Sequence, residues 1–249
     1  MVAKHYGNTG LERMKHLELI AVDLDGPLLT DSFAPLLRQS CEFGGLAYTR
    51  EMEDNMFSRN RKDATRYFMS CFGDNPPESL RNKTHEEMIA DYFAFRAAFL
   101  EENPIQIAEG AETFLQMAGN QGVQLICYGG LDEDYMRREL GPLGDAFDAY
   151  VCTNDFRPGM REIVQDIGKV APDRALFIDD VNFVARHARD LGTAFVGLPA
   201  RTDWGFQRAA MIEDAVPFVL DHLGQIDAAC LEEIDHRAAS GAFWTGGAA

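Results

Sequence analysis

Two apolar strands that each end in a pair of acidic residues restrict the fold more than any other feature. Residues 17–22 are apolar apart from one glutamate and run directly into Asp-Leu-Asp-Gly at residues 23–26. Residues 175–178 lead in the same way into the acidic pair at 179–180, and a helical stretch, residues 182–191, follows. Strands that alternate with helices predict a parallel sheet with helices on both faces. Ligands of such sheets bind beyond the carboxyl ends of the strands, so we expect both acidic pairs at one edge of an α/β fold.

The spacing of these acids predicts a cation site or covalent chemistry. Asp23 and Asp25 are two residues apart at a strand end, so their side chains point to the same side, and Gly26 lets the backbone bend. Such a pair suits cation binding or a nucleophile with its acid. Together with Asp179 and Asp180 it would repel strongly without a cation, which predicts Mg2+. The alternatives are an ordinary Asp-Gly turn for the first pair and a helix N-cap for the second.

These residues resemble the haloacid dehalogenase (HAD) superfamily, in particular its phosphatase branch. Residues 23–26 match the family's first motif, Asp-x-Asp-Gly, and Asp179-Asp180 matches its fourth, acidic motif. The likeness covers roughly residues 17–199, and its motifs are specific only when taken together. It implies that Asp23 is the nucleophile and Asp25 the general acid/base. Dehalogenases of the superfamily lack the second Asp, so Asp25 favours phosphoryl chemistry.

The family's second motif is altered in this chain. It is a strand that ends in Thr or Ser, whose hydroxyl holds the phosphoryl group. The matching residues 124–130 place Tyr128 at the hydroxyl position, followed by Gly129 and Gly130. A phenol reaches further than a hydroxyl, and the two glycine amides remain as phosphate donors. Loss of one donor typically costs on the order of 100- to 1000-fold in rate.

The third motif and the residue after Gly26 also depart from the family pattern. Arg157 stands where Lys is usual, which keeps the positive charge and offers two donors to phosphate, although Arg and Lys are not interchangeable. Pro27 stands where Thr or Val is more frequent. These departures keep a weakened or non-catalytic HAD-fold binding protein open as an alternative.

Composition limits the partners. The formal net charge of -17 argues against nucleic acid and anionic membranes, so an anionic substrate must be attracted by local cations. There is no apolar run of 18 residues, and the N-terminus lacks a signal-peptide core. Because the five cysteines are scattered without CxxC spacing, we expect a reduced, cytoplasmic protein. A homo-oligomer is left open. The cysteines are Cys41, Cys71, Cys127, Cys152 and Cys230.

The remaining elements follow from hydrophobic periodicity. Ser32 is expected to cap a helix that begins after the first strand. Further helices are expected over residues 110–122, 131–140, 159–168, 208–220 and 226–238, and strands over 123–128, 149–153 and 193–198. The aromatic pair Phe243-Trp244 lies in a Gly/Ala-rich tail and could dock on the chain's own surface or on a partner.

About 80 residues between the first strand and Gly110 contain no convincing strand. Helices are expected over residues 50–57 and 62–71, and Thr84 with Glu87 forms a capping box at the start of a third. The resemblance implies that residues 34–104 form the helical cap of HAD subclass I and that residues 1–33 and 105–249 form a Rossmann-like core. The stripe of Met88, Tyr92, Phe95 and Phe99 is expected to pack in the core. The basic residues Arg59, Arg61, Lys62 and Arg66 are expected on a solvated helix face, and the alternative is a clamp for a second anionic group of the substrate.

The resulting hypothesis is a Mg2+-dependent phosphatase that acts on a small phosphorylated metabolite. Asp23 attacks phosphorus and Asp25 protonates the leaving oxygen, while Arg157, Tyr128, Gly129 and Gly130 bind the phosphoryl group. The metal ligands are expected among Asp23, Asp25, Asp179 and Asp180. A phosphomutase or a phosphonate-cleaving relative is the rival enzyme, and the latter needs a cap lysine for imine formation.

Overall fold

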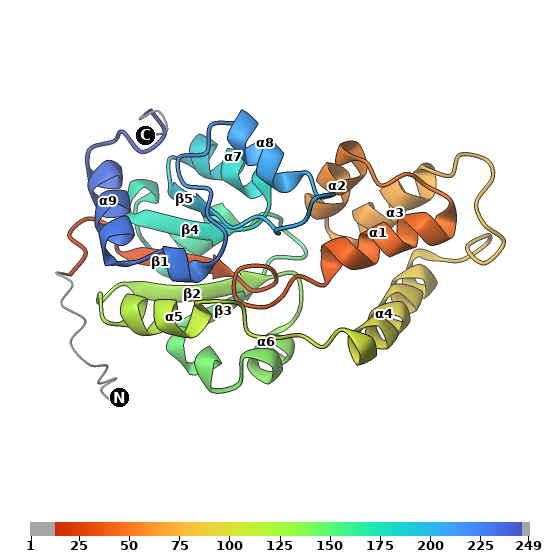
Figure 1. The fold of residues 1–249 in the computed structure, drawn as a ribbon, viewed down its shortest axis with the longest axis horizontal. Helices are drawn as coiled ribbons and strands as arrows, with labels where there is room; N and C mark the ends of the chain where they lie inside the picture. The colour runs from red at the N-terminus through yellow and green to blue at the C-terminus, as the bar shows by residue number, and fades with distance from the viewer. Residues whose placement is uncertain (1–12, 246–249) are drawn as a thin grey trace.

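A single parallel sheet of five strands forms the centre of the described protein (Figure 1). The computed structural model describes residues 13–245. The strand order is β3-β2-β1-β4-β5, so β1 lies in the middle, between β2 and β4. This arrangement confirms the α/β class expected from the sequence. The strands are β1 (Leu19–Asp23), β2 (Gln124–Gly129), β3 (Ala149–Cys152), β4 (Ala175–Asp179) and β5 (Ala194–Gly197).

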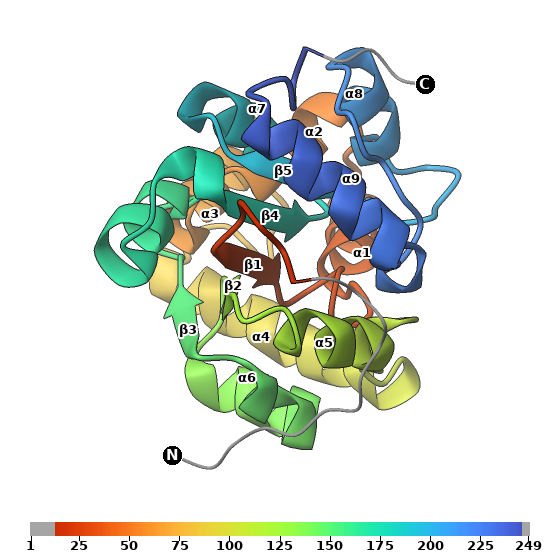
Figure 2. The same ribbon diagram turned by 90° about the vertical axis from the view of Figure 1, so that its left-hand side faces the viewer.

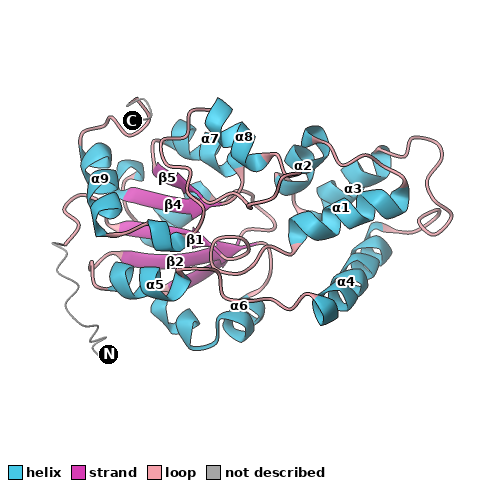
Figure 3. Cartoon of the chain, in the orientation of Figure 1, coloured by secondary structure: helices cyan, strands magenta, loops and turns pink. Residues whose placement is uncertain are grey.

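Helices cover both faces of this sheet, with α5 and α9 on one face and α7 on the other (Figures 2 and 3). The central strands β1 and β4 are apolar up to their final aspartates because they are buried on both faces, and residues 19–22 of β1 are completely inaccessible to solvent. The helices of this core are α5 (Ala111–Gly119), α6 (Glu133–Leu140), α7 (Asn182–Leu191), α8 (Gln207–Glu213), α9 (Ala228–Ala239) and a π-helix (Glu162–Gly168). Short 3-10 turns cover Gly141–Ala146, Pro172–Arg174 and Leu223–Gln225.

Four helices between β1 and α5 form an inserted helical cap beyond the carboxyl ends of the strands (Figure 1). The Thr84 and Glu87 capping box opens the last of them, as expected. Ser32 occupies the N-cap position of the first helix, but its side chain makes no capping bond. Asp31 accepts the N–H groups of Phe33 (2.7 Å) and Ala34 (3.2 Å) instead. The cap helices are α1 (Phe33–Gly44), α2 (Arg50–Phe57), α3 (Arg61–Ser70) and α4 (His85–Glu102).

The apolar stripe of α4 does not pack in a core, which corrects the expectation from its spacing. No side chain of α4 is buried. Met88, Tyr92 and Phe95 line a cavity that α4 shares with the other cap helices and the sheet edge. Helical periodicity identifies an apolar face, but it does not tell whether a core or a cavity lies opposite that face.

The C-terminal part of the chain packs on the sheet core. Helix α8 ends before Pro217, so it is shorter than the helix expected over residues 208–220. On α9, the Asp235 carboxylate accepts the backbone N–H groups of residues 15–17, directly before β1, at 2.7 to 3.3 Å. Phe243 is buried, and the Trp244 indole N–H donates to the Thr193 carbonyl at 2.9 Å. The aromatic pair therefore docks on its own chain.

Residues 1–12, on which the absence of a signal peptide was judged, and residues 246–249 of the Gly/Ala-rich tail lie outside the described residues. Between residues 13 and 245, none of the helices combines the length and the apolar character that crossing a bilayer requires.

Candidate active site

The register of the sheet brings the acidic residues of β1 and β4 to one edge. Asp23 pairs with Tyr128 of β2 on one side, and on the other side Val22 pairs with Ile178, one residue before Asp179. All these strands are parallel, so their carboxyl ends point the same way. Asp23, Asp25, Asp179 and Asp180 line a single cavity between the sheet and the cap. The expected convergence of the four acids is therefore present.

Gly26 is required by the close approach of Asp180. Its φ of 104° belongs to the region that favours glycine, and a Cβ atom at this position would lie 2.5 Å from Asp180 Oδ2. The turn is closed by hydrogen bonds from Gly26 N to Leu29 O (2.9 Å) and from Leu29 N to Leu24 O (3.0 Å). A tight turn without a side chain thus lets the second acidic pair lie against the first.

Burial and mutual repulsion raise the pKa values of these carboxyl groups. Burial raises the pKa of Asp23 most, and the charges of Asp179 and Asp25 raise it further. Burial likewise raises the pKa of Asp180 well above its ordinary value, and the charge of Asp179 adds to the effect. Arg157 opposes these effects, since its charge lowers the pKa of Asp23. A positive charge near this edge of the sheet would therefore stabilise the ionised form of these carboxyl groups.

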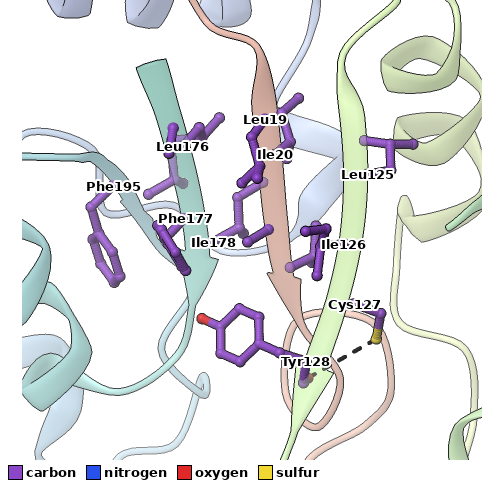
Figure 4. Packing of buried hydrophobic residues seen from close by; sticks show 14 of the residues in the cluster. Leu19, Ile20, Leu125, Ile126, Cys127, Tyr128, Leu176, Phe177, Ile178 and Phe195 are labelled. Carbon is purple, nitrogen blue, oxygen red and sulfur yellow. Dashed lines mark hydrogen bonds between the residues drawn. The ribbon is translucent and has the colours of Figure 1, made fainter. Parts of the chain in front are cut away.

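The Tyr128 ring extends from β2 towards the strand that carries Phe177 and Ile178 (Figure 4), and its hydroxyl bonds to Asp179 at the end of that strand. The phenol O–H donates to Asp179 Oδ2 at 2.6 Å, and the ring contacts Phe177 edge-on at 5.8 Å between centroids. Asp179 Oδ1 accepts the N–H of Val181 at 2.8 Å. The phosphate-binding role expected of Tyr128 does not match this geometry, because its single hydroxyl hydrogen is already donated to Asp179.

Arg157 connects the strand edge to the cap. It follows β3 and precedes Pro158 across a cis peptide bond. Its Nη1 donates to the carbonyl of Phe57, the last residue of α2, at 3.1 Å. Gly130 lies beside the Arg157 guanidinium, and the Gly129 carbonyl accepts the N–H of Thr153 at 2.8 Å. Arg157 and Gly130 thus stand at the acidic cavity, where the sequence placed them.

Comparison with solved structures decides the fold. The beta-phosphoglucomutase of Clostridium difficile superposes with a TM-score of 0.66 at 16% identity, over 90% of this chain and 99% of that one. CbbY from Rhodobacter sphaeroides, in complex with phosphate, gives 0.60 at 16% identity over 84% and 96%. A family IA HAD hydrolase from Entamoeba histolytica gives 0.63 at 12% identity over 88% and 100%.

The chain has the HAD fold. No family model matches the sequence, and no curated protein matches it either. At these identities the likeness concerns the fold, so the chemistry of the HAD-like site has to be argued from its own residues.

Two residues at this HAD-like site had no signal in the sequence. The Tyr135 hydroxyl, on α6, donates to Asp25 Oδ1 at 2.9 Å, and Arg96 Nη2, on α4, donates to the Tyr135 oxygen at 2.7 Å. Burial raises the pKa of Asp25, whereas the Tyr135 hydrogen bond and the Arg96 charge lower it. Arg96 of the cap is therefore connected to Asp25 by hydrogen bonds through Tyr135, a residue of the core.

The donor set fits Mg2+. Among residues 13–245, no three His, Cys, Asp or Glu side chains are gathered as a ready metal cluster. Hydrogen bonds from Tyr128 and Val181 hold the Asp179 carboxylate in place, while Asp23 and Asp180 line the same cavity and are the carboxylates expected to bind the ion. Mg2+ is usually bound through one or two carboxylates, with water and substrate phosphate completing its shell. Two buried carboxylates with raised pKa values meet that requirement.

The basic residues of the cap divide into two groups. Arg66 forms an exposed ion pair with Asp63 at 2.6 Å, as expected for a solvated helix face. Arg59 and Arg61 instead line the cavity, and Arg61 Nη2 donates to the Gly130 carbonyl. Its guanidinium also lies 5.5 Å from the centroid of the Phe93 ring. Arg61 thus links the cap to the strand end that carries Gly130, which corrects the expectation for this residue.

Proposed function

We propose that the protein is a phosphatase that hydrolyses a small phosphate monoester through an aspartyl-phosphate at Asp23. The observation that carries this proposal is the single cavity that holds Asp23, Asp25 and Arg157 with the Asp179-Asp180 pair. Solved structures of this fold include CbbY with phosphate and a CbbY variant with xylulose-1,5-bisphosphate, which supports a phosphorylated substrate.

In the first half-reaction, a carboxylate oxygen of Asp23 attacks phosphorus and the bond to the ester oxygen breaks. Asp25 in its protonated form gives its proton to the leaving oxygen. Burial raises the pKa of Asp25, which favours that protonated form. Arg157 offers positive charge to the equatorial oxygens, where charge accumulates in phosphoryl transfer.

In the second half-reaction, Asp25 accepts a proton from water as the water oxygen attacks the phosphoryl group. The bond between phosphorus and Asp23 breaks, inorganic phosphate leaves, and the protonated Asp25 is regenerated. Mg2+, held by the Asp23 and Asp180 carboxylates and the Asp25 carbonyl, would supply Lewis-acid neutralisation of the phosphate charge. Residues 34–104 act as the cap that keeps bulk water away from the phosphoenzyme.

A phosphonate-cleaving reaction is disfavoured by the two cap lysines. Lys62 is exposed to solvent, and Lys83 forms an ion pair with Asp91. Neither lines the cavity, so neither is placed to form an imine with a substrate there. A phosphomutase remains the second candidate, because the compared structures of this fold include a beta-phosphoglucomutase.

The test is hydrolysis of para-nitrophenyl phosphate with Mg2+ by the wild type and by Asp23→Asn. The substitution removes the nucleophilic oxygen, so turnover should fall at least about 1000-fold. Asp145→Asn, at an exposed site, is the matched control and should keep the wild-type rate. Wild-type activity in Asp23→Asn would refute the nucleophile. If the wild type hydrolyses no ester, the non-catalytic binding protein becomes the better interpretation. Transfer of the phosphoryl group between two positions of a sugar would indicate a phosphomutase.

A further inference from the structure

The cavity that contains the acidic residues extends far into the cap and changes character on the way. Its volume is about 510 Å³, within the range of pockets that hold a complete small molecule. At the sheet edge it is lined by carboxylates and Arg157, as described above. Between α1, α3 and α4 its wall is mostly apolar, although polar side chains of these helices also line it, namely Ser40, Arg61, Thr65, Asp91, Tyr92 and Arg96. The residues that define this apolar end are Leu37, Phe43, Phe68, Met88, Ile89 and Phe95.

Most polar side chains in the cap wall already have hydrogen-bond or ion-pair partners. Arg61 donates to the Gly130 carbonyl and Arg96 to the Tyr135 oxygen of the core. The Ser40 hydroxyl donates to the Leu36 carbonyl and the Thr65 hydroxyl donates to the Arg61 carbonyl, both at 2.8 Å and both within their own helices. Asp91 is paired with Lys83. A sugar placed here would lose water from its hydroxyl groups and gain few partners, which costs about 1–3 kcal/mol for each buried group left unpaired.

Within residues 13–245, the apolar wall stays partly accessible to solvent. No side chain of α4 is buried, and Phe43 of α1 is 80% exposed although its ring contacts Phe95 at 5.6 Å. An apolar surface of this kind, continuous with a polar site, favours an apolar ligand group. Because the acids and the apolar wall belong to one cavity, a single molecule can occupy both ends.

We propose that the substrate is the monophosphate of an apolar alcohol, whose phosphate lies against Asp23 and Arg157 and whose hydrocarbon group fills the space between α1, α3 and α4. The proposal rests on the proposed function for the position of the phosphate. It differs from the sugar bisphosphate found with the CbbY variant.

Binding of ethyl, butyl and octyl phosphate to Asp23→Asn with Mg2+, measured by calorimetry, tests this inference without turnover. Each buried methylene should tighten binding about fourfold, so octyl phosphate should bind at least roughly 30-fold more tightly than ethyl phosphate. Dissociation constants that agree within about twofold across the series would overturn the proposal. Tighter binding of glucose 6-phosphate than of octyl phosphate would overturn it as well.

A pair of cap variants locates the hydrocarbon group. Ile89→Asn puts an amide on the apolar wall and should lower the octyl-to-ethyl affinity ratio about tenfold. Ala94→Asn, exposed on the same helix and outside the cavity, should keep the wild-type ratio. Met88→Gln replaces Ile89→Asn if circular dichroism shows that the latter does not fold. An unchanged ratio in the folded cavity variant would contradict the placement.

The outcomes separate this inference from the proposed function. If para-nitrophenyl phosphate is hydrolysed but the affinity for alkyl phosphates does not depend on chain length, the phosphatase proposal stands and the apolar substrate is refuted. If the affinity for alkyl phosphates rises with chain length but no ester is hydrolysed, the apolar ligand is supported and the phosphatase proposal is refuted. A second copy of this chain is the other possible occupant of the apolar wall, and analytical sedimentation tests for it. A stable dimer that does not bind octyl phosphate would overturn the proposal.

Discussion

Tyr128 stands where HAD phosphatases carry a small hydroxyl residue, yet its phenol bonds to a carboxylate next to the proposed metal ligand Asp180. Its O–H donates to Asp179 at 2.6 Å and helps to fix the carboxylate beside Asp180. Tyr128→Phe keeps the ring that packs on Phe177 and removes only this donor. Because groups that orient metal-binding loops typically contribute 10- to 100-fold in affinity, we expect Mg2+ binding to weaken about tenfold, as measured by calorimetry. Unchanged affinity would show that Tyr128 only fills space. Tyr150→Phe, whose hydroxyl bonds the Leu131 carbonyl, is the matched control.

Asp25 is controlled by Tyr135, which receives a hydrogen bond from Arg96 of the cap. The Tyr135 hydrogen bond and the Arg96 charge both lower the Asp25 pKa. In Tyr135→Phe, the Asp25 pKa should therefore rise and the acid limb of the pH–kcat profile should move to higher pH. Arg96→Lys should move it less, because the positive charge remains. A profile that falls in height without moving along the pH axis would argue for a purely structural role of Tyr135.

Sequence reasoning found the site residues that follow strands and missed those that depend on the cap. Asp23, Asp25 and the later acidic pair were predictable, because parallel strands share an edge whatever connects them. Arg96 and Tyr135 are 39 positions apart, and Tyr135 and Asp25 are 110 apart. No local pattern encodes such contacts, since they depend on how the cap packs against α6. The hydrogen bond from Tyr128 to Asp179 could not be predicted either, because the two residues lie 51 positions apart.

At the scale of elements, Glu53 joins helix α2 of the cap to the core segment that begins α8. This buried carboxylate accepts the Phe206 N–H at 3.0 Å and the Gln207 amide at 2.7 Å, as well as the Tyr48 hydroxyl. Gln207 in turn accepts the N–H of Asn182, directly after the acidic loop of β4. One side of the cap is thus bonded to the element that follows Asp180.

Glu53→Ala should therefore destabilise the whole protein. One buried and two half-buried donors lose their acceptor, and such a loss costs about 1–3 kcal/mol for a buried group that no water reaches, so we expect a total of roughly 3 kcal/mol. Urea unfolding monitored by circular dichroism measures this change. Glu51→Ala, on the exposed face of the same helix, should change the unfolding free energy by less than about 0.5 kcal/mol. Equal effects in the two variants would show that the cap attachment does not depend on Glu53.

Most elements could be located from periodicity, and their errors have physical causes. The bounds of α2 and α7 agree with the expected ranges, since the Thr49 side chain caps the start of α2 and Gly192, with its positive φ, ends α7. Helix α8 ends early because residues 214–217 leave the helical conformation before Pro217. The face of α4 was assigned to a core because an apolar stripe looks the same whether protein or ligand covers it.

At the scale of the whole molecule, buried acids make stability depend on pH and on cations. Burial raises the pKa of Asp31 to about 6, and the pKa values of Asp23, Asp25 and Asp180 are also raised. Between the ordinary carboxyl range and these folded values, the folded state binds more protons than the unfolded state. The unfolding free energy therefore falls as pH rises through this interval.

In EDTA, we expect lower stability at pH 8 than at pH 5, by an amount on the order of 1 kcal/mol or more. Urea titrations at the two pH values measure the difference. Asp31→Asn retains an acceptor for the start of α1 and removes one titrating group, so the difference should shrink, whereas Asp145→Asn should leave it unchanged. Added Mg2+ should raise stability at pH 8 by binding the folded state alone. Greater stability at pH 8 than at pH 5 without metal would contradict the raised pKa values.

The bonds from Asp235 to the backbone before β1 also set an order of events during synthesis. The carboxylate that holds the entry of β1 lies 218 residues later in the chain than Leu17, so β1 is synthesised well before this contact can form. The central strand therefore has to wait for a distant helix before its entry is fixed.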